Sequence, residues 1–206
     1  MQIYESYLGS KYVAETTKTF ILGEIHERAL VEAQADVFSD LLGSYDILLD
    51  STNIVVRHWT TWILAQLAFH SLTRGAVIAV QPCVRLVTLL GDGNVDVVEG
   101  ACYTLSQISR NLDGARAVVE AGALDFIPEL LESTNVGVQR WTSWILAHLA
   151  FHSFTRGAVV AVQPCTRLVA LLGNRLRVQV AGLQLKQQVW IGKHAGCKGY
   201  KTRKPN

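Results

Sequence analysis

The sequence predicts an all-α protein built as an α-solenoid, in which helical repeats stack one on another. Three observations predict this fold: a 33-residue segment that occurs twice, a related stretch between the two copies, and apolar residues spaced three and four apart. The strict alternation of apolar and polar residues that strands need is missing. A helical unit of this kind buries its apolar face only against neighbouring units, so we expect the units to form one stack.

The two copies of the repeated segment are nearly identical. Residues 59–91 read WTTWILAQLAFHSLTRGAVIAVQPCVRLVTLLG and residues 141–173 read WTSWILAHLAFHSFTRGAVVAVQPCTRLVALLG, so 27 of 33 positions agree at a separation of 82. Residues 95–135 align to both copies without a gap at an offset of 41, which pairs YTLSQIS with WILAQLA and WILAHLA. The unit is therefore about 41 residues long, and the near-identical copies are alternate units.

Each unit is expected to contain one long, one short and one medium helix. Pro82 and Pro164 suit the first turn of a medium helix, where the missing N–H costs nothing, and the STN triplets punctuate the turns. The expected long helices are 54–69, 95–109 and 136–151, the short helices are 73–79, 114–121 and 155–161, and the medium helices are 82–90, 123–132 and 164–172.

The two ends of the array depart from the regular pattern. An irregular unit with extra residues at 43–48 comes first, and in the last unit Gln187 stands where Leu105 and Leu146 predict an apolar residue. Residues 175–190 are expected to be either a degenerate capping helix or the product of a mis-predicted gene end, and a further possibility is that the chain is a piece of a longer array. The expected organisation is a lead-in at 1–28, an irregular first unit at 29–70, regular units at 71–111 and 112–152, a degenerate unit at 153–191 and a basic tail at 192–206.

The pattern VxxxAxxxLxxIS, followed by ARAVVEAGALDFIPELLESTN, strongly resembles the Armadillo repeat family over roughly residues 30–189. The resemblance implies a right-handed superhelix of three-helix repeats whose long third helices line a concave groove. Gly122 stands where the family places a glycine between the short and medium helices, whereas Gln81 and Gln163 occupy that position in the other units. The chain is distantly similar to importin alpha, to a vacuolar armadillo scaffold and to catenin repeats.

One stripe of each long helix is predicted to face away from the core. At 100° per residue, Trp62 and Gln66 lie well over 100° around the helix from the core positions. Aromatic rings can hold aliphatic stems, and a Gln or His four residues later can bind a peptide main chain. The expected peptide-binding groove consists of Trp62, Gln66, Tyr103, Gln107, Arg140, Trp144 and His148, with Trp59 and Trp141 either lining it or buried by the next helix.

These residues favour a non-enzymatic scaffold or adaptor that binds an extended segment of another protein. In importin alpha the corresponding helix resembles WxxxN, in which tryptophans sandwich lysine stems and asparagines hold the peptide main chain. Here Gln66, Gln107 and His148 replace the asparagine, and Glu99 is opposed by Arg140, so the groove is not acidic. A nuclear-import adaptor for basic peptides is therefore the less favoured reading.

The distribution of charge keeps an alternative function open. Residues 1–132 hold all 17 acidic residues, whereas residues 133–206 hold eleven Lys and Arg and no Asp or Glu. This basic third predicts either a solvated tail or an electrostatic binder of nucleic acid or anionic membrane. The basic residues concerned are Arg140, Arg156, Arg167, Arg175, Arg177 and the lysines of the tail.

Catalytic, metal and cofactor motifs are not found in the sequence. His148 and His152 are four apart, but the residues between them supply no general base and there is no third ligand. Cys83 and Cys165 read as small buried hydrophobes, and His70 and His152 as residues that end helices. With no signal peptide and no apolar run long enough to span a membrane, we expect a cytoplasmic or nuclear protein of undetermined oligomeric state.

Overall fold

A computed structural model describes Lys18, Ile21, Leu22 and residues 35–173, with the side chains of those first three residues and of residues 42–169. Most of the expected lead-in, residues 174–191 of the expected degenerate unit and the whole basic tail lie outside the described residues. The division into units at the ends of the array therefore stays a prediction.

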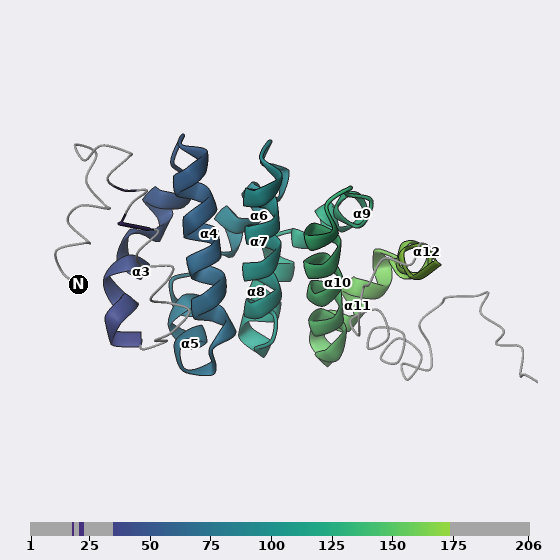
Figure 1. Cartoon of the computed structure of the whole chain (residues 1–206). Coiled ribbons are helices and arrows are strands. Elements are labelled where there is room, and N and C mark those ends of the chain that lie inside the picture. The colour runs from purple at the N-terminus through teal and green to yellow at the C-terminus, as the bar shows by residue number, and fades with distance from the viewer. Residues whose placement is uncertain (1–17, 19–20, 23–34, 174–206) are drawn as a thin grey trace, which may run out of the picture.

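The described part of the chain is a row of helices (Figure 1), which confirms the predicted all-α solenoid. The long helices α4, α7 and α10 stand side by side, and the shorter helices are packed along the row. Residues 43–48, expected as extra residues of an irregular unit, lie inside the continuous helix α3. The elements are α3 (Ala35–Leu49), α4 (Ile54–Phe69), α5 (Ser71–Ala79), α6 (Cys83–Thr88), η1 (Leu89–Gly91), α7 (Val95–Ile108), α8 (Leu112–Glu120), η2 (Ala123–Phe126), α9 (Ile127–Leu131), α10 (Val136–Phe151), α11 (Ser153–Ala161) and α12 (Cys165–Gly173).

Each long helix begins at an asparagine of the same repeat position. The Asn53 Oδ1 accepts a hydrogen bond from the Val55 N–H, and Asn94 and Asn135 cap α7 and α10 in the same way. Such side chains satisfy N–H groups that have no partner within the helix, and each is worth about 1 kcal/mol. The repeated N-cap explains why the long helices start at matching places.

The core runs through the row because the same position of each long helix carries a buried leucine. Leu64, Leu105 and Leu146 are completely buried. Burying a leucine side chain contributes roughly 1.5–3 kcal/mol, so these layers supply much of the driving force for stacking. The periodic residues that predicted helices are therefore the residues that hold neighbouring repeats together.

Polar links also recur between equivalent positions. Arg85 on α6 binds Asp50 with an Nε to Oδ2 distance of 3.0 Å, and Arg167 on α12 binds Glu132 with an Nε to Oε1 distance of 2.8 Å. Both pairs are largely exposed to solvent, so each contributes little to stability. Their recurrence shows that the repeat is conserved in three dimensions as well as in sequence.

The turn between the short and medium helices has the same backbone conformation in all three units. Gly122 has a φ of 83°, and Gln81 and Gln163 have φ values of 55° and 50°. This left-handed conformation is free of penalty for glycine and costs a residue with a Cβ atom about 1 kcal/mol or more. The two glutamine units thus adopt the turn that the glycine unit prefers.

We expect Gln81→Gly to raise the free energy of unfolding by about 0.5–1 kcal/mol, because it removes the left-handed strain at a small cost in chain entropy. Gly122→Ala is the matched control and should lower the free energy of unfolding by a similar amount or more, because alanine is strained in the left-handed conformation. A steric clash does not complicate this control, since a Cβ atom there meets only ordinary contact. Urea unfolding followed by circular dichroism measures both. A loss of stability in Gln81→Gly would contradict this account of the turn.

Candidate functional site

The candidate site is the face formed by α4, α7 and α10, which is the face predicted for the groove. Gly100 on α7 occupies the repeat position that Trp59 and Trp141 hold on α4 and α10. A Cβ atom on Gly100 would stand 2.2 Å from the Thr61 Oγ1 and 3.1 Å from the Trp62 Cδ1. The missing side chain therefore lets α4 and α7 approach closely at this face.

A hydrogen bond between the two helices uses this close approach. The buried Thr104 hydroxyl donates to the Thr61 carbonyl on α4 over 2.7 Å, and its oxygen also lies 2.9 Å from the Gly100 carbonyl. A side chain that reaches a carbonyl of the neighbouring helix fixes the relative height of α4 and α7. The height in turn decides which aromatic rings of the two helices meet.

Three aromatic rings form a row across the long helices. The centroids of Trp62 and Tyr103 lie 5.6 Å apart in an edge-to-face contact, and Tyr103 stacks on Trp141 with a centroid distance of 4.1 Å and an interplanar angle of 22°. We call Trp62, Tyr103 and Trp141 the aromatic row. Offset and edge-to-face pairs of this kind contribute about 0.5–1.5 kcal/mol beyond their burial. The row is therefore a preformed surface rather than a set of free side chains.

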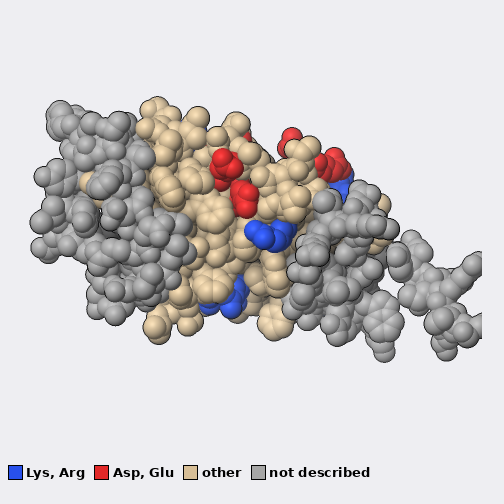
Figure 2. Space-filling model, in the orientation of Figure 1, with Lys and Arg blue, Asp and Glu red and all other residues tan. Residues whose placement is uncertain are grey.

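The row ends at a charged pair. The Arg140 guanidinium lies 4.4 Å from the centre of the Trp141 ring, and its Nη2 is 3.9 Å from the Glu99 Oε1. Figure 2 shows acidic atoms near the upper end of this face and basic atoms at its centre and lower edge. Because Glu99 already faces Arg140, the middle of the face carries little net charge.

A second group of side chains lies nearer the C-terminal ends of the helices. Trp144 contacts His148 at a centroid distance of 5.4 Å, and the His148 Nδ1 lies 2.8 Å from the Ser106 carbonyl on α7. A carbonyl only accepts, so Nδ1 carries the proton and the Nε2 of the neutral ring is an acceptor. Burial lowers the pKa of His148 to about 4, although the hydrogen bond to Ser106 opposes the shift. His148 is therefore neutral at pH 7.

Two residues expected on the open face are buried instead. Tyr103 is 7% exposed because the rings of Trp62 and Trp141 cover it, and burial raises the pKa of its phenol. Gln107 is 6% exposed, because its amide donates to the Ser106 hydroxyl and accepts from Arg110. Neither side chain is open to a ligand in the way the helical periodicity suggests.

The other predicted groove residues lie at intermediate or full exposure. Trp62, Gln66, Trp144 and His148 are half-buried, and Arg140 is exposed. Trp59 and Trp141, for which the sequence left two readings, are half-buried and pack against the core. The structure thus brings Trp62, Tyr103, Trp141 and Arg140 together, and separately joins Trp144 to His148.

Two indole N–H groups on this face have no hydrogen-bond partner among the described residues. They are the buried Nε1 atoms of Trp62 and Trp141, and the buried His58 Nδ1 on α4 is also without one. A buried donor without a partner costs about 1–3 kcal/mol. Sequence analysis did not detect this feature, nor the role of Gly100, because both depend on the height at which neighbouring helices meet.

His70 and His152 lie at the C-cap positions of α4 and α10, as expected for residues that end helices, but other side chains bind the last carbonyls of these helices. The Arg74 Nε and Nη2 donate to the carbonyls of Ala68 and Phe69, each over 2.7 Å, and the Thr73 hydroxyl donates to Leu67. Arg156 and Thr155 do the same for α10. The imidazole of His152 instead contacts the Ser109 carbonyl of α7 over 3.1 Å.

Reactive groups do not converge in the described part of the chain. Within residues 35–173 and the three described residues before them, no three His, Cys, Asp or Glu side chains are placed to hold a metal ion. Cys83 and Cys102 are buried, and burial raises the pKa of each thiol to about 12, while Cys165 is only partly buried. Thiols of this kind stay protonated and are poor nucleophiles.

Among the described helices, none alone has the length and apolar character of a membrane span. One pair, Ser71–Ala79 with Cys83–Gly91, reaches that length and composition only when joined across a bend of 89°.

No protein-family model matches the chain, and no curated protein sequence matches it. Among solved structures, it is similar to a designed armadillo repeat protein in complex with the peptide (KR)4, at a TM-score of 0.82 and 20% identity over 91% of this chain and 81% of that one. A second designed armadillo repeat protein gives a TM-score of 0.82 at 19% identity, over 95% of this chain and 87% of that one. Computationally designed armadillo repeat proteins for modular peptide recognition give 0.78 at 19% identity, over 91% and 81%.

These likenesses establish an armadillo-like repeat fold for this chain, as the sequence predicted. At about 20% identity they concern the fold alone. The fold is one that commonly serves as a protein-binding scaffold.

We expect Gly100→Ala to lower the free energy of unfolding by about 1–2 kcal/mol, because the added methyl group collides with Thr61 between two packed helices. Gly75→Ala is the control within a helix: nothing lies within 4 Å of its Cβ position, so it should stabilise the protein by up to about 1 kcal/mol. Urea unfolding compares the two variants. Equal effects would show that α4 and α7 do not need the close contact.

The pKa of His148 makes a prediction about pH. The folded protein holds the proton less tightly than the unfolded chain, whose histidine pKa is about 6.5, so His148 costs stability as the pH falls from about 6.5 to about 4. His148→Gln removes this cost, because glutamine does not titrate. Glutamine is also the residue at the equivalent repeat position, Gln66. Between pH 7 and pH 5, the free energy of unfolding should fall by about 1–2 kcal/mol more in wild type than in His148→Gln. A difference between the two proteins that does not change with pH would contradict the assignment.

Proposed function

We propose that the protein is a non-enzymatic scaffold that binds an extended segment of another protein across α4, α7 and α10. The observation that carries the proposal is the aromatic row, which crosses three adjacent long helices on one face. Its two tryptophans are half-exposed on either side of the buried Tyr103, and aromatic residues that are left partly exposed in a cluster generally mark interaction sites. Designed armadillo repeat proteins with this fold bind peptides, which supports the same use of the fold here.

The arrangement suits a peptide that crosses the helices. Packed helices lie about 8–10 Å apart, and an extended chain advances about 3.3 Å per residue, so each helix meets about three ligand residues. Trp62 and Trp144 would contact aliphatic stems, and Trp141, which is supported from below by the buried Tyr103, would form the floor between them. Gln66 and the His148 Nε2 offer groups for main-chain hydrogen bonds at the two ends.

The local charge favours a peptide of low net charge. Glu99 faces Arg140, so no uncompensated acidic group stands in the centre of the face to attract a lysine or arginine. A nuclear-import adaptor for basic peptides therefore gains no support from this face. We expect apolar or aromatic ligand side chains to contribute most of the affinity.

The electrostatic alternative gains little from the basic C-terminal third. Arg140 and Arg167 face Glu99 and Glu132, and Arg156 donates to the carbonyls at the end of α10. Arg175, Arg177 and the tail lysines lie outside the described residues. The scaffold therefore remains the proposed function, with adaptor role, partner and compartment open to experiment.

Selection from a library of random peptides tests the proposal. We expect wild type to enrich a family of apolar or aromatic peptides, and Trp62→Ala and Trp144→Ala each to weaken their binding roughly tenfold or more, as central aromatic contacts do. Val84→Ser is the control, because Val84 is exposed on α6 and not on this face. Fluorescence polarisation with a labelled peptide measures each Kd. Peptides whose binding is insensitive to both tryptophan variants would place the binding site elsewhere.

A further inference from the structure

The eight arginines in the described part of the chain divide into two sets. Four of them face a carboxylate at N to O distances of 2.8–3.9 Å; these are Arg57, Arg85, Arg140 and Arg167. The other four have no carboxylate partner among the described residues; these are Arg74, Arg110, Arg116 and Arg156. All four unpaired arginines lie in the turns that follow α4, α7 and α10, or in the short helix after each turn.

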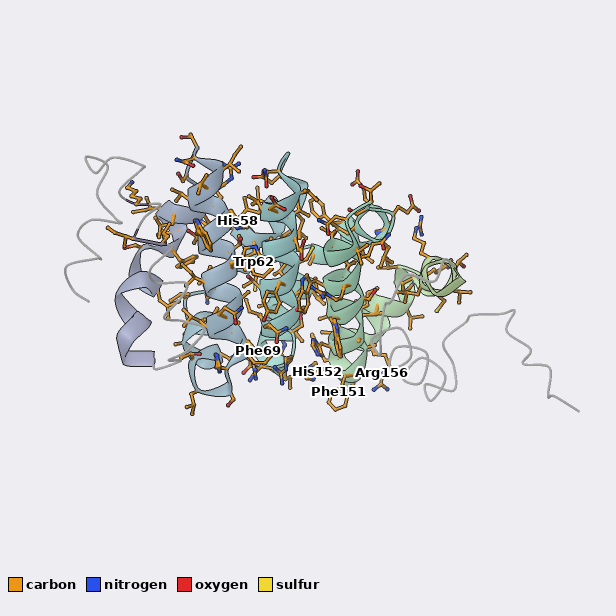
Figure 3. The ribbon with its side chains drawn as sticks, viewed as in Figure 1. His58, Trp62, Phe69, Phe151, His152 and Arg156 are labelled. Atoms are coloured by element: carbon orange, nitrogen blue, oxygen red, sulfur yellow. The ribbon has the colours of Figure 1, made fainter. Side chains whose placement is uncertain are left out.

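The same turns carry exposed apolar side chains. Leu72 is 83% exposed, the highest value among the large apolar residues, and the others at these turns are Phe69, Leu112, Phe151 and Phe154 at 45–64%. Figure 3 shows Phe69 at the lower end of α4, Phe151 at the lower end of α10 and Arg156 nearby on α11, so all three lie along the lower edge of the row. We call these five apolar residues and the four unpaired arginines the rim.

Contacts between turns make the rim continuous. The Arg110 guanidinium lies 5.8 Å from the centre of the Phe69 ring, and its Nη1 donates to the Phe69 carbonyl over 3.4 Å. Arg116 lies 4.6 Å from the centre of the Phe154 ring. Each of these contacts joins one repeat to the next, so cations and rings are held side by side along one edge of the solenoid.

The positive charge of the rim exceeds the negative charge of the same turns and short helices. Arg74 and Arg156 each use two N–H groups on helix carbonyls, but carbonyls carry no formal charge. The turns and the short helices after them hold two described carboxylates, Asp113 and Glu120, both on α8. Four positive charges against two negative leave a net charge of +2. Figure 2 shows basic atoms between uncharged projections at this lower edge.

We propose that the rim binds the surface of a membrane that contains anionic phospholipids. Phenylalanine and leucine side chains at the tips of turns can enter the boundary between headgroups and acyl chains, while guanidinium groups beside them bind phosphate. The rim occupies an edge rather than a concave face, and it presents all three turns to one surface. A second copy of this chain would bring unpaired arginines against one another, so self-association through the rim is disfavoured.

Sedimentation of the full chain with vesicles tests the proposal, which does not rest on the peptide groove. We expect wild type to bind vesicles of phosphatidylcholine with phosphatidylserine, to bind pure phosphatidylcholine weakly, and to lose binding as salt rises. Arg110→Gln with Arg116→Gln should weaken partitioning about 25-fold, which is about fivefold for each basic residue near an anionic surface. Leu72→Ser with Phe154→Ser should weaken it at least tenfold.

Matched variants keep the result specific to the rim. Val84→Ser removes an apolar side chain that is 67% exposed on α6, and Arg167→Gln removes an arginine that faces Glu132. Both controls, and Trp62→Ala with Trp144→Ala, should bind vesicles as wild type does. Circular dichroism checks that every variant is folded, and all variants keep the basic tail.

Several outcomes would overturn the proposal. One is a wild type that does not bind anionic vesicles. Another is full binding by the rim variants, which would mean that other basic residues supply the affinity. Equal losses in the control variants would also overturn it. If the rim variants lose binding to an acidic peptide while wild type ignores vesicles, the rim is a protein-binding site and the membrane proposal is wrong.

Discussion

The close contact between α4 and α7 at Gly100 decides the geometry of the functional face. A Cβ atom at this position would stand 2.9 Å from the Thr61 Cβ, so only glycine allows the two helices to approach as they do. The approach brings the Thr104 hydroxyl to the Thr61 carbonyl and sets Trp62 beside Tyr103. The aromatic row, and with it the proposed peptide site, follows from one missing side chain in the middle unit.

The solenoid has two different surfaces, one along the sides of the long helices and one at their ends. The face of α4, α7 and α10 is aromatic, and its central charges face one another as Glu99 and Arg140. The rim at the ends of the same helices has exposed apolar side chains and arginines that face no carboxylate within the described part of the chain. Because face and rim use different residues, a peptide partner and an anionic surface could be bound at the same time.

The repeat allowed much of the fold to be predicted from the sequence. Two copies that share 27 of 33 positions give the same periodicity twice, and α4 and α10 span the residues expected for them. The short helices begin two residues earlier than expected, because His70, Asn111 and His152 serve as N-cap residues. The medium helix of the first unit is divided into α6 and η1, and that of the middle unit into η2 and α9, a difference that apolar spacing alone does not reveal.

The candidate site was less predictable, because helical periodicity treats each helix alone. It placed Tyr103 and Gln107 on an open stripe, but side chains on α4 and α10 cover Tyr103, and Ser106 and Arg110 hold Gln107. It also paired Tyr103 with Trp144 by repeat position, whereas the ring that stacks on Tyr103 is Trp141, one turn earlier. These contacts depend on the relative height of neighbouring helices, which Gly100 and Thr104 set. Helical periodicity does not predict that height.

Nuclear magnetic resonance of the indole N–H groups tests the central claim most directly. The chain has five tryptophans, so a proton–nitrogen spectrum has five indole signals, which single Trp→Phe variants can assign. On addition of a selected peptide, the account predicts that the Trp62 and Trp144 signals move most and that the Trp59 signal, from a ring packed against the core, moves least. Binding that leaves the Trp62 and Trp144 signals in place would contradict the account, because the peptide would then lie on another surface.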